Sequence, residues 1–204
     1  MKWLVGVDEV GRGPLAGPIS VGVVVALERH YPKVCRAFRT LGSGDSKTLS
    51  AARRERVARG LRRMAARGEV LVAVRSVSAT YIDRRGIVSA ARRAVAAALR
   101  AVGANSALAD VSLDAGLTAP KFFTQRSIVR GEAAHPLIGA ASCLAKVSRD
   151  ALMARLAAKY PGYGFEEHAG YGTLAHRRAI VALGPSAVHR RSFLKTILAA
   201  KLAT

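Results

Sequence analysis

The sequence predicts an α/β domain with a mixed β-sheet flanked by helices, followed by a small C-terminal helical subdomain. Short apolar runs rich in valine alternate with helical patterns through the first half of the chain. From about residue 136 onward the periodicity is helical. The length of 204 residues suits one domain with a small appendage and is sufficient for a sizeable core.

The first elements follow from apolar runs and from the residues that interrupt them. Strands are predicted at 2–7 and 19–27, and the short Gly/Pro-rich connection between them suits antiparallel neighbours. A loop that contains residues 42–47 is expected next. Ser50 is then predicted to cap a basic helix that runs to about Arg67.

The remaining elements are predicted from the same patterns. They are a β-rich run at 69–77, an alanine-rich helix at 82–102, strands at 107–114 and ending at 128–129, and helices at 136–159, near 174–183 and from about 191. A Pro-Gly sequence at 161–164 ends the long helix. We therefore expect a main domain at 1–159 and a helical subdomain at 160–204.

The charge of the chain indicates a polyanionic partner. Lys and Arg number 33 against 13 Asp and Glu, which gives a net charge of +20. The apolar runs are too short to span a membrane, and Cys35 and Cys143 lack metal-binding spacing. A cytoplasmic monomer with no membrane association and no obligatory protein partner is expected. A basic ribosome-associated protein would have a similar charge, so that alternative stays open on charge alone.

The segment Val7–Pro18, VDEVGRGPLAGP, is the most informative part of the sequence. It ends an apolar strand with two adjacent carboxylates, Asp8 and Glu9, which repel each other and are costly to bury unpaired. Divalent cations prefer oxygen ligands and neutralise such clusters. The glycines that follow let backbone N–H groups approach a ligand closely. This combination predicts metal-dependent chemistry on a phosphate ester.

Further motifs follow in order along the chain: DSK at 45–47, LD at 113–114, AAS at 140–142, LAKVSRD at 144–150, YGF at 163–165, HAGYGT at 168–173 and HRRSF at 189–193. With the N-terminal segment, they resemble the type 2 ribonuclease H family, ribonuclease HII, over nearly the whole chain. The resemblance implies a ribonuclease H-like sheet and a two-metal site for Mg²⁺ or Mn²⁺. It also implies cleavage 5′ of ribonucleotides in RNA/DNA hybrids and at single ribonucleotides in duplex DNA, leaving 3′-hydroxyl and 5′-phosphate ends.

By the same resemblance, Asp8, Glu9 and Asp114 match three of the family's four metal-binding acids. Asp110 points to the same face of its strand as Asp114, because the two residues are four apart. Asp114 is preferred, since the strand is predicted to end there. Asp110 is expected to be a surface acid near the start of the strand.

The fourth acid departs from the family pattern, because Glu132 stands where the family has aspartate. Glutamate keeps the charge and the donor atoms but is one methylene longer. Retained activity with an altered metal preference or a lower rate is expected. A protein that binds RNA/DNA hybrids with impaired catalysis is the alternative.

Several residues are implied to bind the substrate: Gly11, Arg12, Gly13, Ser46, Lys47, Lys146 and Tyr171. The Gly-Arg-Gly segment would contact the ribose 2′-hydroxyl largely through its backbone, which distinguishes RNA from DNA. Tyr171 would pack on the next sugar, and Lys47 with Ser46 would hold a phosphate.

The sequence leaves the roles of Lys146 and Arg149 open and suggests a role for His168. Lys146 and Arg149 suit phosphate contact or structural pairing equally well, and His168 is expected to be structural within a glycine-rich turn. The helices after residue 160 are expected to clamp the minor groove of the duplex.

Overall fold

In the computed structural model, residues 2–41 and 49–202 are described. Five strands form one sheet in the order β3-β2-β1-β4-β5. Their bounds are Trp3–Val10 (β1), Ile19–Leu27 (β2), Val70–Val77 (β3), Ala109–Asp114 (β4) and Thr124–Ile128 (β5). β1 is antiparallel to β2 and parallel to β4, so the sheet is mixed, as predicted.

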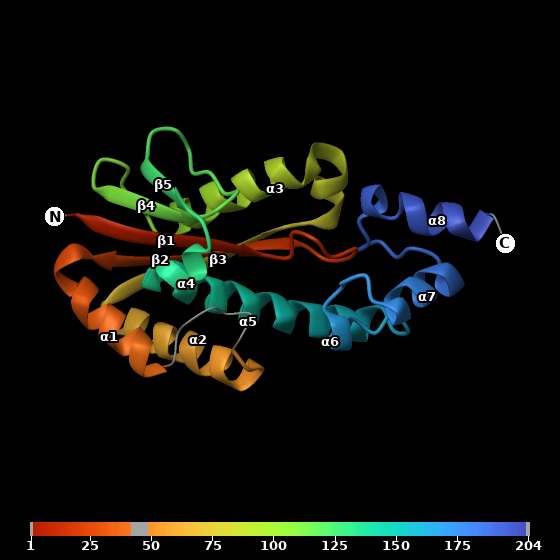
Figure 1. Ribbon diagram of the computed structural model, residues 1–204, viewed down its shortest axis with the longest axis horizontal. Helices are drawn as coiled ribbons and strands as arrows, with labels where there is room; N and C mark the ends of the chain where they lie inside the picture. Colours follow the sequence, from red (N-terminus) through yellow and green to blue (C-terminus); the bar gives the residue numbers. More distant parts are fainter. Residues whose placement is uncertain (1, 42–48, 203–204) are drawn as a thin grey trace.

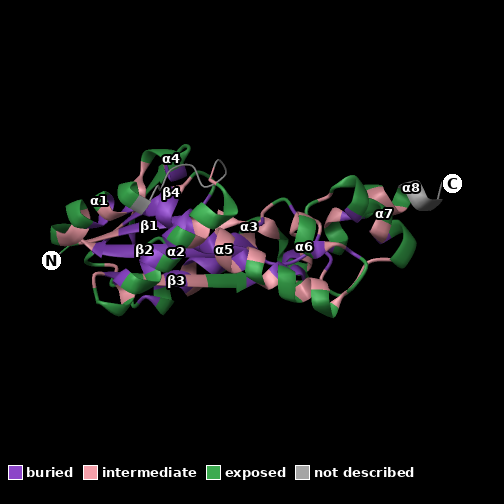
Figure 2. Ribbon diagram, turned by 90° about the horizontal axis from the view of Figure 1, so that it is seen from below, coloured by how far each residue is buried: buried purple, intermediate pink, exposed green. Residues whose placement is uncertain are grey.

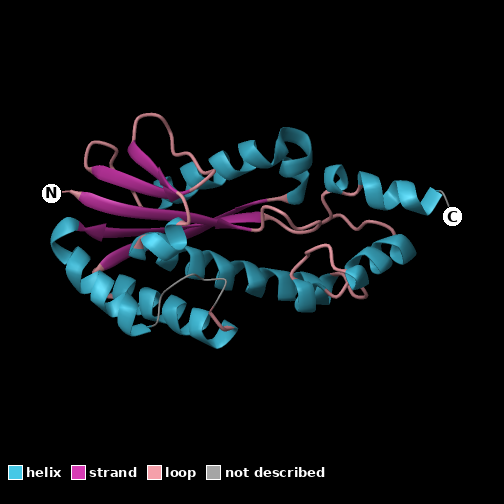
Figure 3. Ribbon diagram, viewed as in Figure 1, coloured by secondary structure: helices cyan, strands magenta, loops and turns pink. Residues whose placement is uncertain are grey.

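Helices cover both faces of this sheet (Figures 1 and 3). The helix α3, Ala79–Ala101, lies on one face, while α1, Tyr31–Leu41, α2, Ala51–Ala66, and α5, Pro136–Lys159, lie on the other. The strand interiors are buried between these layers (Figure 2). The architecture is the predicted mixed sheet flanked by helices.

Each face of the sheet has its own hydrophobic core. On the α3 side, Val5 and Val7 of β1 pack in a cluster with alanines of the helix. On the other side, Val24 of β2 packs with Phe38 and Leu61 from α1 and α2. Because side chains alternate along a strand, the even-numbered residues of β1, such as Gly6, face α5. Asp8 is one of these residues.

The loop predicted after β2 is wrong in part, because residues 28–41 are helical. A short 3₁₀ turn, Glu28–His30, leads into α1. Val34 and Phe38 are fully buried and lie four residues apart, which places them on one face of the helix. That spacing was the available signal, and tertiary packing of these two side chains stabilises a helix between basic and polar residues.

Two glycines allow α5 to lie directly on the sheet. A Cβ at Gly6 of β1 would come within 2.3 Å of the Leu137 backbone, and one at Gly22 of β2 would come within 2.3 Å of the Ala141 carbonyl oxygen. Any larger residue would push the helix away from the strands. This close approach brings the N-terminal half of α5 beside Asp8.

The C-terminal helices lie at the end of the molecule farthest from the N-terminus (Figure 1). They are α6, Phe165–His168, α7, Leu174–Leu183, a 3₁₀ turn at Arg191–Phe193, and α8, Lys195–Leu202. Buried Phe165, Ile180 and Leu194 pack with Met153 near the end of α5 and with Ala16 of the loop after β1. The last helix therefore begins later than predicted, because residues 191–193 form a separate turn.

Among the described residues, no helix is both long enough and apolar enough to cross a lipid bilayer. Cys35 and Cys143 are both free thiols in buried positions.

Candidate active site

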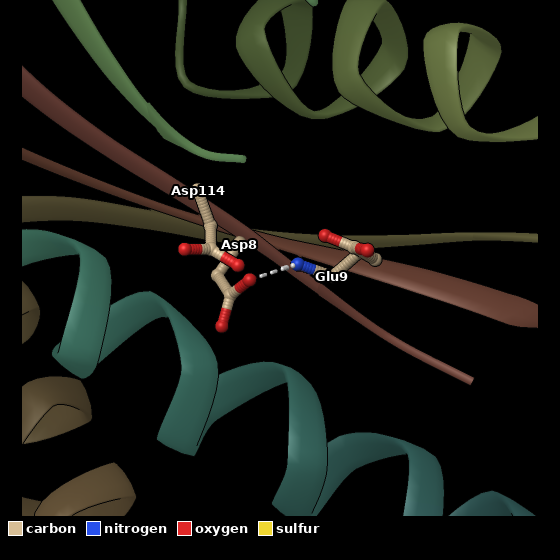
Figure 4. A group of neighbouring side chains, drawn as sticks. All are labelled: Asp8, Glu9 and Asp114. Atoms are coloured by element: carbon tan, nitrogen blue, oxygen red, sulfur yellow. Dashed lines mark hydrogen bonds between the residues drawn. The ribbon is translucent and has the colours of Figure 1, made fainter. Parts of the chain in front are cut away.

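The acids predicted to bind metal meet at one edge of the sheet. Parallel pairing sets Val7 of β1 beside Leu113 of β4, so Asp8 and Asp114 follow on adjacent strands. One carboxylate oxygen from each of Asp8, Glu9 and Asp114 lies within 4.8 Å of the others. Figure 4 shows the carboxylates of Asp8 and Asp114 together above α5, with Glu9 beside them on β1.

Burial and like charge make Asp8 an unusual acid. Its side chain is 4% exposed, and its Oδ1 accepts a hydrogen bond from the Glu9 N–H at 2.7 Å. Desolvation, with the neighbouring charges of Glu9 and Asp114, raises the pKa of Asp8 to about 8, although a hydrogen bond from Ser142 acts in the opposite direction. A cation bound between the carboxylates would relieve this repulsion.

Asp114 is held in place, and Asp110 is engaged elsewhere. The Gly131 N–H donates to Asp114 Oδ1 at 2.8 Å, which orients the carboxylate at the end of β4. Asp110 lies near the start of β4 and pairs with Lys2, with 3.3 Å between Oδ2 and Nζ. The structure therefore separates the two aspartates that share a face of this strand.

Glu132 lies in the short helix α4, Gly131–Ala134, and is 8% exposed. Ser142 of α5 donates a hydrogen bond from Oγ to Glu132 Oε2 at 3.1 Å. The glutamate lines the same cavity as the three other acids but is not one of the three whose oxygens lie within 4.8 Å. Glu132 therefore contributes to the cavity from α4 and contacts α5 through Ser142.

The four acids line a cavity of about 490 Å³. The other lining residues are Val10, Gly11, Arg12, Gly13, Arg54, Ser142, Lys146 and Tyr171. Every predicted site residue within the described part of the chain lines this cavity: the four acids, Gly11, Arg12, Gly13, Lys146 and Tyr171. The side chain of Tyr171 is 43% exposed. Ser46 and Lys47 lie outside the described residues.

Two basic side chains in the cavity are already paired. Arg12 Nε lies 3.0 Å from Glu9 Oε1, and its Nη2 donates to the Gly116 carbonyl at 3.0 Å. Lys146 Nζ donates to Asp150 Oδ1 at 2.8 Å, one turn along α5. Both pairs are partly exposed, so they are weak enough to exchange for a phosphate.

The structure resolves the role of Arg149, which the sequence left open, and agrees with the structural role expected for His168. Arg149 is fully buried and donates to the carbonyls of Pro18, Ala169 and Ala16 at 2.9–3.2 Å, so its role is structural. His168 accepts from the Gly170 N–H at 3.2 Å and donates to the Tyr163 carbonyl at 2.8 Å, as a structural turn residue does.

Sequence reasoning missed Arg54 and Ser142 as cavity residues, although both stood within predicted helices. Ser142 was visible in the pattern, because it lies four residues before Lys146 and hence on the same face of α5. Arg54 is one of many arginines in α2, and nothing in its spacing distinguishes it. Only the packing of α2 against α5 selects it.

The donor set fits a divalent cation of the hard type. Carboxylate oxygens are the ligands that Mg²⁺ and Mn²⁺ prefer, and the open cavity leaves room for water and phosphate oxygens. Within the described residues, this is the group of acids whose oxygens come close enough together to share an ion.

Comparisons with known proteins agree with this geometry. The sequence model of the ribonuclease HII family matches residues 5–196. Ribonuclease HII of Halorhodospira halophila is 44% identical over 93% of this chain and 91% of its own length. Ribonuclease HII of Bacillus velezensis is 42% identical over 94% of this chain and 69% of its own length.

Solved structures share the fold. Ribonuclease HII of Archaeoglobus fulgidus, determined in a complex with PCNA, has a TM-score of 0.74 at 22% identity and covers 95% of this chain and 96% of its own. Bst-RNase HIII in complex with Mn²⁺ has a TM-score of 0.68 at 20% identity and covers 100% of this chain and 71% of its own. From the family match and the curated relatives together, this chain belongs to the ribonuclease HII family of type 2 ribonuclease H endonucleases.

Proposed function

We propose that this protein hydrolyses the phosphodiester on the 5′ side of ribonucleotides, both in RNA/DNA hybrids and at single ribonucleotides embedded in duplex DNA. The products carry a 3′-hydroxyl and a 5′-phosphate. The observation that carries the proposal is the position of the Gly11–Gly13 backbone in the same cavity as Asp8, Glu9 and Asp114. The backbone segment that we assign to ribose recognition thus lines the same cavity as the acids that we assign to metal binding.

In this proposal Asp8, Glu9, Asp114 and Glu132 hold two ions of Mg²⁺ or Mn²⁺. When bound, such ions activate an attacking water and stabilise the leaving oxygen of an in-line displacement. The carboxylates orient the ions. Burial, and to a lesser extent the charges of Glu9 and Asp114, raise the pKa of Asp8, and a bound cation would favour its ionised form. The hydrogen bond from Gly131 keeps Asp114 aimed into the cavity.

Substrate recognition involves the residues around the acids. The backbone of Gly11, Arg12 and Gly13 receives the 2′-hydroxyl, and Tyr171 packs on the following sugar. When the substrate binds, Lys146 breaks its contact with Asp150 and binds a phosphate of the nucleic-acid backbone. We assign Ser46 and Lys47 to the binding of a second phosphate of the substrate backbone.

The division at residue 160 is part of the proposal. Residues 160–204, which include α6, α7 and α8, act as a subdomain that clamps the duplex against the catalytic domain at 1–159. Tyr171 belongs to this segment and lines the catalytic cavity, which supports a direct role in substrate contact. The buried free cysteines are consistent with a reducing, cytoplasmic setting.

A cleavage assay tests the proposal. A DNA duplex with one ribonucleotide and its all-DNA counterpart are incubated with Mg²⁺ or Mn²⁺, and the products are sized. A single nick 5′ of the ribonucleotide is expected, and the all-DNA duplex should stay intact. Ribonucleotide-dependent binding without a nick would support the hybrid-binding alternative, and equal treatment of both duplexes would contradict the proposal.

Asp114 and Asp110 provide a matched pair of variants. Asp114→Asn removes one charge from the acid cluster and should reduce cleavage at least about a hundredfold, as loss of a metal ligand does. Asp110→Asn removes the same charge from the same strand face, where the partner is Lys2, and should leave cleavage unchanged. Equal effects of the two variants would remove the support for this metal site.

A further inference from the structure

The loop that follows β1 is held by a buried arginine from the other end of the sequence. Arg190 is 0% exposed. It donates from Nη2 to the Gly11 carbonyl at 2.6 Å, from Nη1 to the Arg12 carbonyl at 2.8 Å and from Nε to the Gly17 carbonyl at 3.0 Å. All three guanidinium nitrogens thus donate hydrogen bonds to carbonyls of one loop.

Packing alone does not account for a charge at this position. A buried guanidinium is expensive to desolvate, and an apolar residue of similar volume would fill the space at lower cost. Within the described residues, Arg190 has no ion pair with a carboxylate. Carbonyl oxygens therefore take the place of a counter-ion, and the shape of the loop is what these hydrogen bonds specify.

The direction of the carbonyls determines the direction of the neighbouring amides. In a trans peptide unit the C=O and the following N–H point in opposite directions. Since the Gly11 and Arg12 carbonyls point at Arg190, the N–H groups of Arg12 and Gly13 point away from it. Neither N–H has a hydrogen-bond acceptor in the part of the chain that the structure describes, and both residues line the catalytic cavity.

Arg190 is itself fixed relative to this loop. Its N–H donates to the Leu15 carbonyl at 2.8 Å, and the Gly17 N–H donates to the Val188 carbonyl at 2.9 Å. Its guanidinium also lies over the Phe193 ring, 5.3 Å from the centroid. Backbone hydrogen bonds therefore tie the C-terminal segment to this loop on either side of the Arg190 guanidinium.

We propose that Arg190 is a positioning residue that aims the backbone amides of Arg12 and Gly13 at the ribose 2′-hydroxyl. It touches no substrate and acts through the two peptide units that it orients. This inference rests on the proposed function, because it assigns the origin of ribose selectivity within that same site.

The test is Arg190→Lys, which keeps the positive charge but can satisfy only part of the three-carbonyl arrangement. Dissociation constants are measured without divalent ions for a duplex with one ribonucleotide and for its all-DNA counterpart. Binding of the ribonucleotide duplex should weaken about five- to tenfold, as for one lost hydrogen bond, toward the value for the all-DNA duplex. Binding of the all-DNA duplex should stay within about twofold, because its phosphate contacts are unchanged.

Arg191→Lys is the matched control, since Arg191 is the adjacent arginine and its side chain is exposed. It should bind both duplexes as the unchanged protein does. Arg190→Gln, which removes the buried charge but keeps two donors, is the second variant if Arg190→Lys does not fold. Thermal unfolding verifies that each variant is native at the assay temperature.

The outcomes separate this inference from the proposed function. Retained preference for the ribonucleotide duplex in a folded Arg190 variant overturns the positioning role, and so does a failure of both variants to fold, which would make Arg190 structural. If the unchanged protein itself shows no preference for the ribonucleotide duplex, the proposed function fails first.

Discussion

Glu132 and Ser142 illustrate how single residues tune the acid cluster. Glu132 comes from α4 and Ser142 from α5, and the hydroxyl donates to the carboxylate at 3.1 Å within a buried environment. A carboxylate that is oriented in this way loses less freedom when it binds an ion. The glutamate that departs from the family pattern is therefore supported by a partner on the neighbouring helix.

The hydrogen bond from Ser142 to Glu132 should contribute to metal binding. Ser142→Ala should lower cleavage or the apparent affinity for Mg²⁺ about tenfold, because groups that orient metal ligands typically contribute this much. The measurement is cleavage rate as a function of Mg²⁺ concentration. Ser148→Ala, on the same helix but outside the cavity lining, is the control and should behave as the unchanged protein. A Ser142→Ala curve that superimposes on it would show that the hydroxyl has no such role.

The close contact between Gly22 and α5 should make the stability of the protein sensitive to substitution at this position. A Cβ there would lie 2.3 Å from the Ala141 carbonyl oxygen, so Gly22→Ala should lower the free energy of unfolding by about 2 kcal/mol. Denaturant unfolding measures this change. Gly13→Ala meets no atom within 4 Å and should change the unfolding free energy by less than about 0.5 kcal/mol. A similar loss for both variants would contradict the close approach of α5.

At the level of elements, three histidines in the C-terminal segment have defined tautomers. The Ser186 N–H donates to His189 Nδ1, so His189 Nε2 carries the proton and donates to His176 Nε2 at 3.1 Å. His176 Nδ1 in turn donates to the Tyr171 carbonyl at 2.8 Å. His168 stacks on His176, with 4.4 Å between ring centroids. The chain of hydrogen bonds requires neutral rings throughout.

Stability should therefore depend on pH. Burial and the neighbouring ring lower the pKa of His189 to about 4, and burial lowers the pKa of His176. Because these folded-state pKa values lie below the unfolded value near 6.5, protonation favours the unfolded chain. The free energy of unfolding should be constant with respect to these groups above about pH 6.5 and fall by about 2 kcal/mol toward pH 4.

Thermal unfolding from pH 8 to pH 4 measures this dependence. His189→Asn should flatten it, since the group with the most strongly lowered pKa is gone. An unchanged slope in His189→Asn would contradict the assignment.

The elements also show where sequence patterns succeed. The strand at 19–27 and the helix at 174–183 have the bounds that apolar spacing predicts, and Ser50 caps α2 by accepting from the Arg53 N–H. These features depend on local periodicity and capping. The helix α1 was missed, because its basic and polar surface obscures the buried pair Val34 and Phe38.

The functional site likewise contains residues that could be predicted from the sequence and contacts that could not. The sequence singled out Asp8 and Glu9 by two adjacent carboxylates at a strand end, and the family resemblance added Asp114 and the Gly-Arg-Gly segment. The structure brings all of these residues to one cavity. The contacts of Arg149 and Arg190 could not be predicted. All but one of their partners are backbone carbonyls more than a hundred residues away, and every residue type carries the same backbone carbonyl.

On the scale of the whole molecule, the net charge of +20 sets the conditions for binding. If about four phosphates are neutralised, the logarithm of affinity should fall with the logarithm of salt with a slope of about −3.6. Raising salt from about 50 to about 200 mM should then weaken duplex binding by about two orders of magnitude. Fluorescence anisotropy with labelled duplex measures the slope, and a salt-independent affinity would contradict an electrostatic contribution.

The contacts between the first loop and the last segment affect the order of assembly during synthesis. The strands and α5 are complete once residue 159 has been translated, so the sheet can form while the ribosome is still working. The carbonyls of Gly11 and Arg12 meet their donor only after Arg190 emerges. The acid cluster can therefore assemble before the C-terminal segment exists, whereas the ribose selectivity proposed for this loop would be acquired only after that segment has been synthesised.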